Sequence, residues 1–154
     1  MRIEFGLCLP RDETSVPLVR HLCRATLKRL GAEAECVHDI EVAVSEACTN
    51  VLRHVSSSDD QYEVGIVIED VLCTVRVTDA GEGFDSAVVV GSDLAAESGR
   101  GIQLMRHLVD DLNFSSRPEE GTVVELRKGL SLEASSIIRL MGSRAPAAGF
   151  DAPG

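Results

Sequence analysis

A period-two run of apolar residues that ends in a carboxylate constrains this chain most. The run consists of Val71, Cys73, Val75 and Val77. Such alternation is typical of a β-strand with one buried face. Asp79 takes the next position in the same phase, so a charged side chain is predicted to point into the core. A buried charge without a partner is costly, so we expect Asp79 to be paired.

Two glycines, Gly81 and Gly83, follow Asp79 directly. Glycine allows a sharp turn or a close approach of the backbone to a ligand. By itself, Asp-x-Gly-x-Gly is equally compatible with a polar turn at the end of a strand, because short glycine motifs have little specificity. The interpretation of this stretch therefore depends on the rest of the chain.

Composition indicates one soluble domain with an acidic surface. The chain has 154 residues, no Trp and a formal net charge of −10, so its core is expected to be mainly aliphatic. The charge argues against binding to nucleic acid or to an anionic membrane, and it is compatible with a basic protein partner. The odd number of cysteines, without Cys-x-x-Cys, suggests buried thiols in a reducing compartment. No run approaches the roughly 18 apolar residues of a membrane helix, so we expect a cytoplasmic protein.

Hydrophobic periodicity predicts an α+β fold. Strands are predicted at Arg2–Leu9, Tyr62–Glu69, Val71–Asp79, Asn113–Arg117 and Thr122–Lys128. Helices are predicted from Asp12–Ser15 to Leu30 with Gly31 as the C-terminal cap, from Glu33 or His38 to Val55, and from Ile102 to Leu112. Residues 85–98 are predicted to form a lid-like loop. These elements predict a two-layer sandwich, with a mixed, mostly antiparallel sheet covered by helices on one face.

The sequence lacks the motifs of two common nucleotide-binding folds, the Rossmann fold and the P-loop fold. No glycine motif follows the first strand, as a Rossmann domain requires, and strands do not alternate with helices. The P-loop pattern Gly-x-x-x-x-Gly-Lys-Ser/Thr is also absent.

The main domain is expected to span residues 1–130, with a possible helix in 131–144 and a disordered tail at 145–154.

Three further patterns are candidate sites, and each has an alternative explanation. Glu46 and Asn50 are four residues apart, so they lie on one face of the second helix, facing either a shared site or solvent. A glycine-containing loop, Ser98–Gly101, is predicted to run into a helix N-terminus, where phosphate is favoured. The first helix carries a basic row that is either solvated or a docking surface for an acidic partner. This row comprises Arg20, Arg24 and Lys28, followed by Arg29.

Four short motifs, taken together, resemble the boxes of the GHKL (Bergerat-fold) ATP-binding superfamily. They are Glu46–Asn50, Asp79–Phe84, Ser98–Ile102 and Gly121–Val124, which resemble the N box and the three glycine boxes in order. The segment Ala43–Val51 is most similar to the subgroup of anti-sigma-factor serine/threonine kinases. The resemblance implies an ATP-dependent protein kinase that phosphorylates an anti-sigma-factor antagonist, sequesters a sigma factor and forms a homodimer.

The same resemblance implies a role for each matching residue. Glu46 would be the general base, and Asn50 would bind both the nucleotide and Mg²⁺. The other nucleotide-binding residues would be Asp79 at the adenine amino group, Gly81 and Gly83 beside it, Gly99, Arg100 and Gly101 at the phosphates, and Thr122 at the adenine end. An alternative is a nucleotide-gated regulator of the same fold without significant kinase turnover. A histidine-kinase catalytic domain is disfavoured, because a strand and a helix fill the segment before Glu46.

Overall fold

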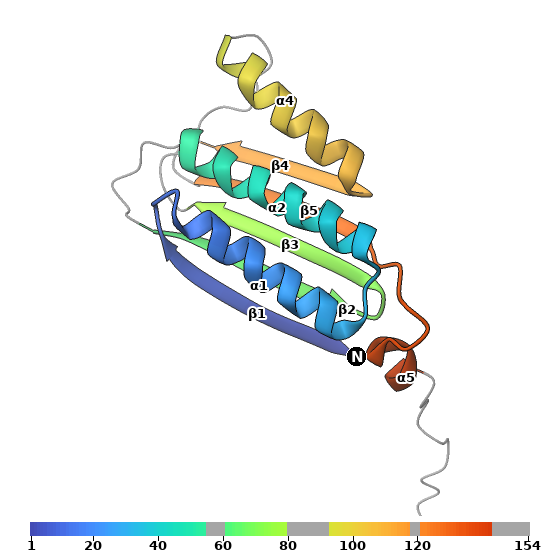
Figure 1. Ribbon diagram of the computed structural model, residues 1–154. Coiled ribbons are helices and arrows are strands. Elements are labelled where there is room, and N and C mark those ends of the chain that lie inside the picture. Colours follow the sequence, from blue (N-terminus) through green and yellow to red (C-terminus); the bar gives the residue numbers. More distant parts are fainter. Residues whose placement is uncertain (55–60, 80–92, 118–120, 143–154) are drawn as a thin grey trace, which may run out of the picture.

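Five strands and four helices make up the described part of the chain. The computed structural model describes residues 1–54, 61–79, 93–117 and 121–142. The strands are β1 (Arg2–Pro10), β2 (Gln61–Glu69), β3 (Leu72–Asp79), β4 (Asp111–Arg117) and β5 (Gly121–Gly129). The helices are α1 (Ser15–Leu30), α2 (Ala34–His54), α4 (Asp93–Leu108) and α5 (Ile137–Gly142). Figure 1 shows α1, α2 and α4 on one face of the sheet, which confirms the predicted α+β two-layer fold.

The strands form one sheet in the order β1-β2-β3-β5-β4. Every pairing between the described strands is antiparallel, so the sheet is simpler than the mixed one that was expected. Strands that follow one another along the chain pair as two hairpins, β2–β3 and β4–β5. Because β1 and β3 are both antiparallel to β2, they run in the same direction. Their last residues, Pro10 and Asp79, therefore lie at the same end of the sheet.

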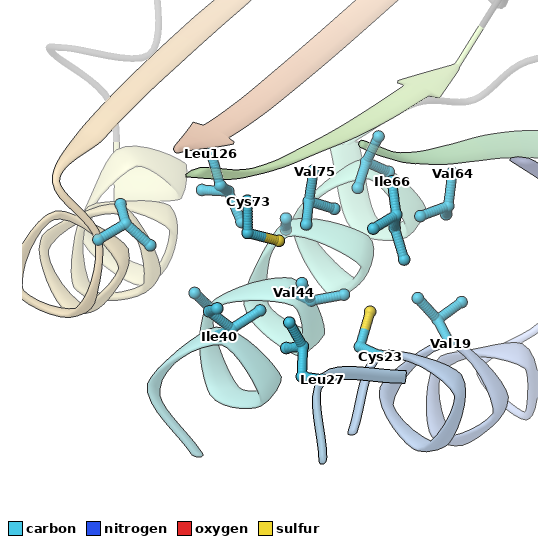
Figure 2. Packing of buried hydrophobic residues seen from close by; sticks show 14 of the residues in the cluster. Val19, Cys23, Leu27, Ile40, Val44, Val64, Ile66, Cys73, Val75 and Leu126 are labelled. Carbon is cyan, nitrogen blue, oxygen red and sulfur yellow. The ribbon is translucent and has the colours of Figure 1, made fainter. Parts of the chain in front are cut away.

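The core between sheet and helices is aliphatic, as the composition predicts. Figure 2 shows side chains of α1 and α2 packed against those of β2, β3 and β5. From α2, Ala43, Val44, Ala47, Cys48 and Val51 are completely buried. Since each large buried apolar side chain stabilises the fold by about 1.5–3 kcal/mol, this face anchors α2 against the sheet. The polar residues of α2 on its other faces are thereby fixed in direction.

The thiols divide into one exposed and four buried cysteines. Cys23, Cys36, Cys48 and Cys73 are buried, as predicted for small apolar side chains. For Cys8 the expectation of a buried thiol is wrong: it is exposed, and its Sγ lies 3.2 Å from Oε1 of Gln61. On β1 the buried phase runs through Leu7 and Leu9, so Cys8 points to the opposite face.

Gly31 ends α1 as predicted, and the structure requires a glycine there. Its φ is 84°, and the backbone N–H groups of Gly31 and Ala32 donate to the carbonyls of Lys28 and Leu27. A Cβ at this position would lie 2.6 Å from Cα of Ser136. Ser136 also donates a 2.7 Å hydrogen bond to the carbonyl of Leu30. The segment that leads to α5 is therefore packed against the end of α1.

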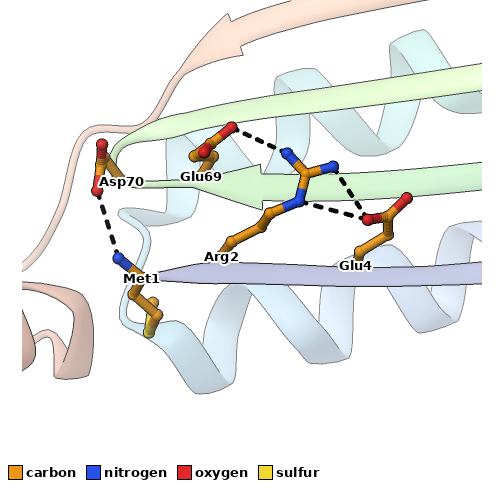
Figure 3. Close-up of polar contacts among 5 residues, drawn as sticks. All are labelled: Met1, Arg2, Glu4, Glu69 and Asp70. Atoms are coloured by element: carbon orange, nitrogen blue, oxygen red, sulfur yellow. Dashed lines mark hydrogen bonds and ion pairs between the residues drawn. The ribbon is translucent and has the colours of Figure 1, made fainter.

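The sheet face opposite the helices carries charged side chains. Arg76 of β3 donates to Glu125 of β5, and Arg127 donates to the same carboxylate. Near the N-terminus, Arg2 pairs with Glu4 and Glu69, each at 3.0 Å (Figure 3). Glu125 is only 9% exposed, so the two arginines compensate a largely buried carboxylate on this face.

The third predicted helix differs from α4 at both ends. The sequence predicts a loop up to Ser98 and a helix that begins near Ile102, whereas α4 begins at Asp93. The reason is local propensity: residues 94–97 are Leu-Ala-Ala-Glu, all strong helix formers, so the helix extends toward the N-terminus. At the other end α4 stops at Leu108, and Leu112 belongs to β4. The remainder of the predicted lid, residues 85–92, lies outside the described residues.

Candidate functional site

Asp79 is the last residue of β3, and it is a buried carboxylate with a cation beside it. Its exposed fraction is 0%, and Nη1 of Arg11 donates to its Oδ2. The expectation that this carboxylate is paired is met, and the partner within the protein is Arg11, which was not predicted. Across the sheet, Asp79 is opposite Thr122 of β5, which is 1% exposed. An ionised acceptor and a hydroxyl group therefore lie together at this end of the sheet.

Arg11 is the residue of the site that sequence reasoning missed. It follows β1 directly and lies at the end of the sheet where β3 also ends. The available signal was topological: two strands that are both antiparallel to a third must end at the same edge. Without knowing that β2 separates β1 from β3, the sequence could not bring Arg11 and Asp79 together.

Glu46, the first residue of the polar row on α2, faces α4. Glu46 is half-buried and Asn50 is 9% exposed, which places both at the border of the core. A Cβ added to Gly101 of α4 would lie 2.9 Å from Oε2 of Glu46. The Glu46 carboxylate thus lies directly against the backbone of α4. Glu46 therefore contacts a second element and is not exposed to solvent alone.

The glycines of the second glycine-rich motif lie inside α4 and not before it. Gly99, Arg100 and Gly101 come at least six residues after Asp93, the first residue of the helix. The predicted helix N-terminus at these residues is therefore wrong for this structure, since interior N–H groups are bonded within the helix. Two glycines inside a helix cost about 1 kcal/mol each relative to alanine. At Gly101 the missing side chain has a purpose, because it leaves room for Glu46.

Two other predicted residues, Gly81 and Gly83, lie outside the described residues. The exposed row on α1 is described: Arg20, Arg24 and Lys28 all point away from the core. Arg20 Nε lies 3.5 Å from the Glu41 carboxylate on α2. α1 contains no acidic residue, so its outer face is locally basic on an acidic protein.

An open groove of about 420 Å³ lies between the start of α1 and the end of α2. Val16, Pro17 and Leu52 form part of its lining, together with the side chains of Arg11 and Arg53. Leu52 and Thr49 line this groove on the α1 side of α2, whereas Glu46 faces α4. The groove and the Glu46 carboxylate are therefore on different sides of the same helix, and Arg11 lines the groove and contacts Asp79.

Metal binding at this site can be judged from its donor set. Among the residues that the structure describes, no group of three or more His, Cys, Asp or Glu side chains could hold a metal ion. Mg²⁺ does not require such a cage, because it commonly keeps several waters and takes one or two protein oxygens plus substrate phosphates. The amide oxygen of Asn50, at the border of the core, fits that kind of coordination.

Comparison with known proteins agrees with this geometry. A family model for the histidine kinase-like ATPase domain matches residues 9–128. The chain belongs to this family. Its use of ATP follows from that membership, and the predicted relationship to the GHKL superfamily is confirmed. No described helix of this ATPase domain is long and apolar enough to cross a membrane.

Named relatives indicate the subgroup of this family to which the chain is most similar. The serine-protein kinase RsbW of Bacillus velezensis is 31% identical, over 81% of this chain and 84% of that protein. The anti-sigma F factor of Pasteuria penetrans is 30% identical, over 84% of this chain and 90% of that protein. The subgroup predicted from the sequence motifs, anti-sigma-factor serine kinases, is therefore confirmed.

Solved structures agree on the fold. The crystal structure of the RsbU and RsbW domains of Rv1364c from Mycobacterium tuberculosis matches with a TM-score of 0.67 at 21% identity. That match covers 86% of this chain and 34% of the other. The SiaB–SiaC complex from Pseudomonas aeruginosa matches with a TM-score of 0.55 at 14% identity, over 82% of this chain and 88% of the other. At these identities the likeness concerns the fold alone.

Proposed function

We propose that this chain is an ATP-dependent serine/threonine protein kinase and anti-sigma factor. Its substrate is an anti-sigma-factor antagonist, and its second partner is a sigma factor that it sequesters. Relatives named serine-protein kinase RsbW and anti-sigma F factor, aligned over more than four fifths of this chain, support this kind of activity. The structural observation that carries the proposal is the buried acceptor Asp79 at the end of the sheet. Arg11 links it to Leu52 in the last turn of α2, the helix that carries Glu46 and Asn50.

Asp79 and Thr122 serve as the base-recognition end of the site in this proposal. An ionised carboxylate only accepts hydrogen bonds, and the amino group of adenine is a donor. Asp79 is buried at the end of β3, so water does not compete for it. Thr122, opposite on β5, supplies a hydroxyl group to the same end. Gly81 and Gly83 let the backbone after β3 approach the base closely.

Glu46 and Asn50 serve as the reacting end. When bound, ATP supplies the phosphoryl group and Mg²⁺ neutralises the charge on it. Asn50 binds the nucleotide and would hold the ion through its amide oxygen. Glu46, one helical turn away, would accept the proton of the serine or threonine hydroxyl as that oxygen bonds to the γ-phosphorus of ATP. The bond from this phosphorus to the bridging oxygen would break, and ADP would leave. Positioning and charge neutralisation then account for most of the rate enhancement.

Gly99, Arg100 and Gly101 bind the phosphates in this proposal, which requires a change in α4. Their N–H groups become free donors only if the first turns of α4 open, since they now lie inside the helix. The two glycines weaken the helix at this point, so opening is cheaper there than in an alanine helix. The exposed Arg100 adds a positive charge beside the phosphates.

The basic row on α1, comprising Arg20, Arg24 and Lys28, is the proposed contact with a protein partner. Its support is charge complementarity, because this helix has no acidic residue. We also propose that the protein acts in the cytoplasm, where a sigma factor is found, and that it forms a homodimer.

Incubation with radiolabelled ATP and purified candidate antagonist proteins from the same genome tests the function. We expect label on a serine or threonine of one antagonist. Glu46→Gln should keep ATP affinity and lower the transfer rate by about 10²–10⁴-fold, the usual contribution of a general base. Asp79→Asn should lower ATP affinity itself, as measured by calorimetry.

Three results would contradict parts of the proposal. ATP binding without transfer to any antagonist would favour the alternative, a nucleotide-gated regulator without turnover. Equal ATP affinity of wild type and Asp79→Asn would remove Asp79 from the nucleotide site. Unchanged transfer in Glu46→Gln would remove Glu46 as the base.

A further inference from the structure

Arg11 connects the base-recognition carboxylate to two other elements. Its Nη1 donates to Oδ2 of Asp79, and its Nη2 lies 3.5 Å from the carbonyl oxygen of Leu52. Leu52 is in the last turn of α2, where carbonyl groups lack partners within the helix and carry partial negative charge. One guanidinium group thus joins the end of β1, the end of β3 and the C-terminus of the helix that carries Glu46 and Asn50.

The segment that carries Arg11 is itself held in place. Oγ of Ser15 donates to the carbonyl of Asp12 at 2.6 Å, so it accepts the hydrogen of the Tyr62 hydroxyl, 2.5 Å away. Both Ser15 and Tyr62 are buried. The Asp12 carboxylate in turn accepts the N–H of Thr14 at 2.9 Å. Arg11 therefore extends from a fixed turn and not from a loose loop.

Burial makes this ion pair important for the charge state of Asp79. The side chain of Asp79 is 0% exposed and that of Arg11 is 12% exposed. Without a cation, a carboxyl group in such surroundings favours its neutral, protonated form. Removing one partner of a buried pair also leaves an uncompensated charge, which proteins rarely tolerate. The positive charge of Arg11 therefore keeps Asp79 ionised.

The ion pair is compatible with base recognition. The contact from Arg11 is with Oδ2, and a carboxylate has about four lone-pair positions over its two oxygens. Asp79 can accept from Arg11 and from an amino group at the same time. In its ionised form it cannot donate, so it repels a carbonyl oxygen at the same place. A protonated Asp79 would donate to that oxygen and lose this discrimination.

We propose that Arg11 is a positioning residue that determines base specificity: by holding Asp79 as an acceptor, it selects a purine with a 6-amino group over one with a 6-oxo group. This inference rests on the proposed function, in which Asp79 receives the adenine amino group. It adds to that proposal a residue outside all four motifs. The charge of Arg11, rather than its bulk, carries the effect.

The test compares ATP with ITP, in which an oxo group replaces the 6-amino group. Affinities of the full chain for both nucleotides are measured by calorimetry in the presence of Mg²⁺. Arg11→Met should lower the ATP/ITP affinity ratio by at least about tenfold, as expected for loss of one charge-assisted hydrogen bond. Arg11→Lys should restore most of the ratio. Arg53→Met, a loss of charge in the same groove, is the matched control and should leave the ratio unchanged.

Arg11→Gln protects the test against misfolding, because it keeps a donor for the Leu52 carbonyl but has no charge. The ATP/ITP affinity ratio of Arg11→Gln should fall as much as that of Arg11→Met. A lower melting temperature with an unchanged ratio in both neutral variants would overturn the inference and make Arg11 a structural residue. If the ATP/ITP affinity ratio fell equally in Arg53→Met, the inference about Arg11 would be overturned as well. Wild-type protein that binds neither nucleotide would overturn the proposed function, whereas ATP binding with an unchanged ratio overturns only the role of Arg11.

Discussion

Glu46 and Gly101 meet where α2 and α4 pack together. The distance of 2.9 Å from a Cβ added at Gly101 to Oε2 of Glu46 is shorter than real Cβ contacts allow. The atom that must move is the end of a flexible side chain, so the fold can adapt at little cost. A Cβ at position 101 would instead change the direction of the Glu46 carboxylate, and the proposed mechanism requires that direction to be fixed.

Gly101→Ala should therefore separate stability from catalysis. Alanine is favoured over glycine inside a helix by about 1 kcal/mol, so the urea unfolding midpoint should stay the same or rise. The rate of phosphoryl transfer should fall by about tenfold or more, because the methyl group displaces the Glu46 carboxylate. Gly142→Ala is the control, since a Cβ there meets nothing within 4 Å. Unchanged transfer in Gly101→Ala would mean that the position of Glu46 is not critical.

At the level of single residues, the sequence was informative where a residue broke a pattern. Asp79 interrupts an apolar phase, which predicted both that it is buried and that it is paired. The identity of the partner, Arg11, depends on strand order and could not be read from local pattern. The contact between Glu46 and Gly101 is equally non-local, because 54 intervening residues separate the two positions in the sequence.

Among the elements, α1 has the surface on which docking of a protein partner can be tested most directly. Its core side is buried through Val19, Cys23 and Leu27, and its outer side carries the basic row. Arg20 already contacts Glu41 of α2, so a change there would also disturb packing between the helices. Arg24 and Lys28 are better positions at which to test docking.

The double variant Arg24→Glu, Lys28→Glu should weaken capture of the sigma factor or antagonist by about tenfold or more, since it reverses two charges on the docking surface. ATP affinity should be unchanged, because these residues lie on α1, away from Asp79 and Asn50. Pull-down with purified partners, with and without ATP, measures the effect. Arg139→Glu on α5 provides a charge reversal at an exposed position elsewhere. The same partners captured with the same strength would identify the basic row as an ordinary solvated face.

The limits of prediction at the element level appear in α4. Strands and hairpins followed from period-two patterns, and Gly31 marked the end of α1. For α4 the glycines suggested a loop, whereas Leu94 to Glu97 have strong helix propensity. Two local signals conflicted there, and the helical one prevails in this structure.

The molecule as a whole has one surface thiol and a core that contains the others. Burial raises the pKa of Cys23, Cys48 and Cys73 from 9 to about 12. At neutral pH these groups are protonated, and the thiolate is the reactive form. Between pH 9 and 12 an unfolded chain loses protons that the folded chain keeps, so stability should fall as the pH rises through this range.

Alkylation of the native protein at neutral pH should modify one cysteine rapidly. Mass spectrometry should locate it at Cys8, which is exposed, and Cys8→Ser should remove the rapid phase. In denaturant all five cysteines of the sequence should react. Rapid labelling of a second thiol without denaturant would show that the core opens more easily than this packing indicates.

The shared direction of β1 and β3 has a practical consequence for attaching the protein to a surface. Both strands start at the end of the sheet where the N-terminus and α5 lie together (Figure 1). Met1, Leu132 and Ile138 line a common groove there. Both strands finish at the opposite end, beside Arg11 and Asp79. A tether fixed before Met1, or at α5, would thus hold the molecule by the end of the sheet remote from Asp79. The end with Asp79, where we propose that the nucleotide binds, would face outward, which suits surface immobilisation and single-molecule work.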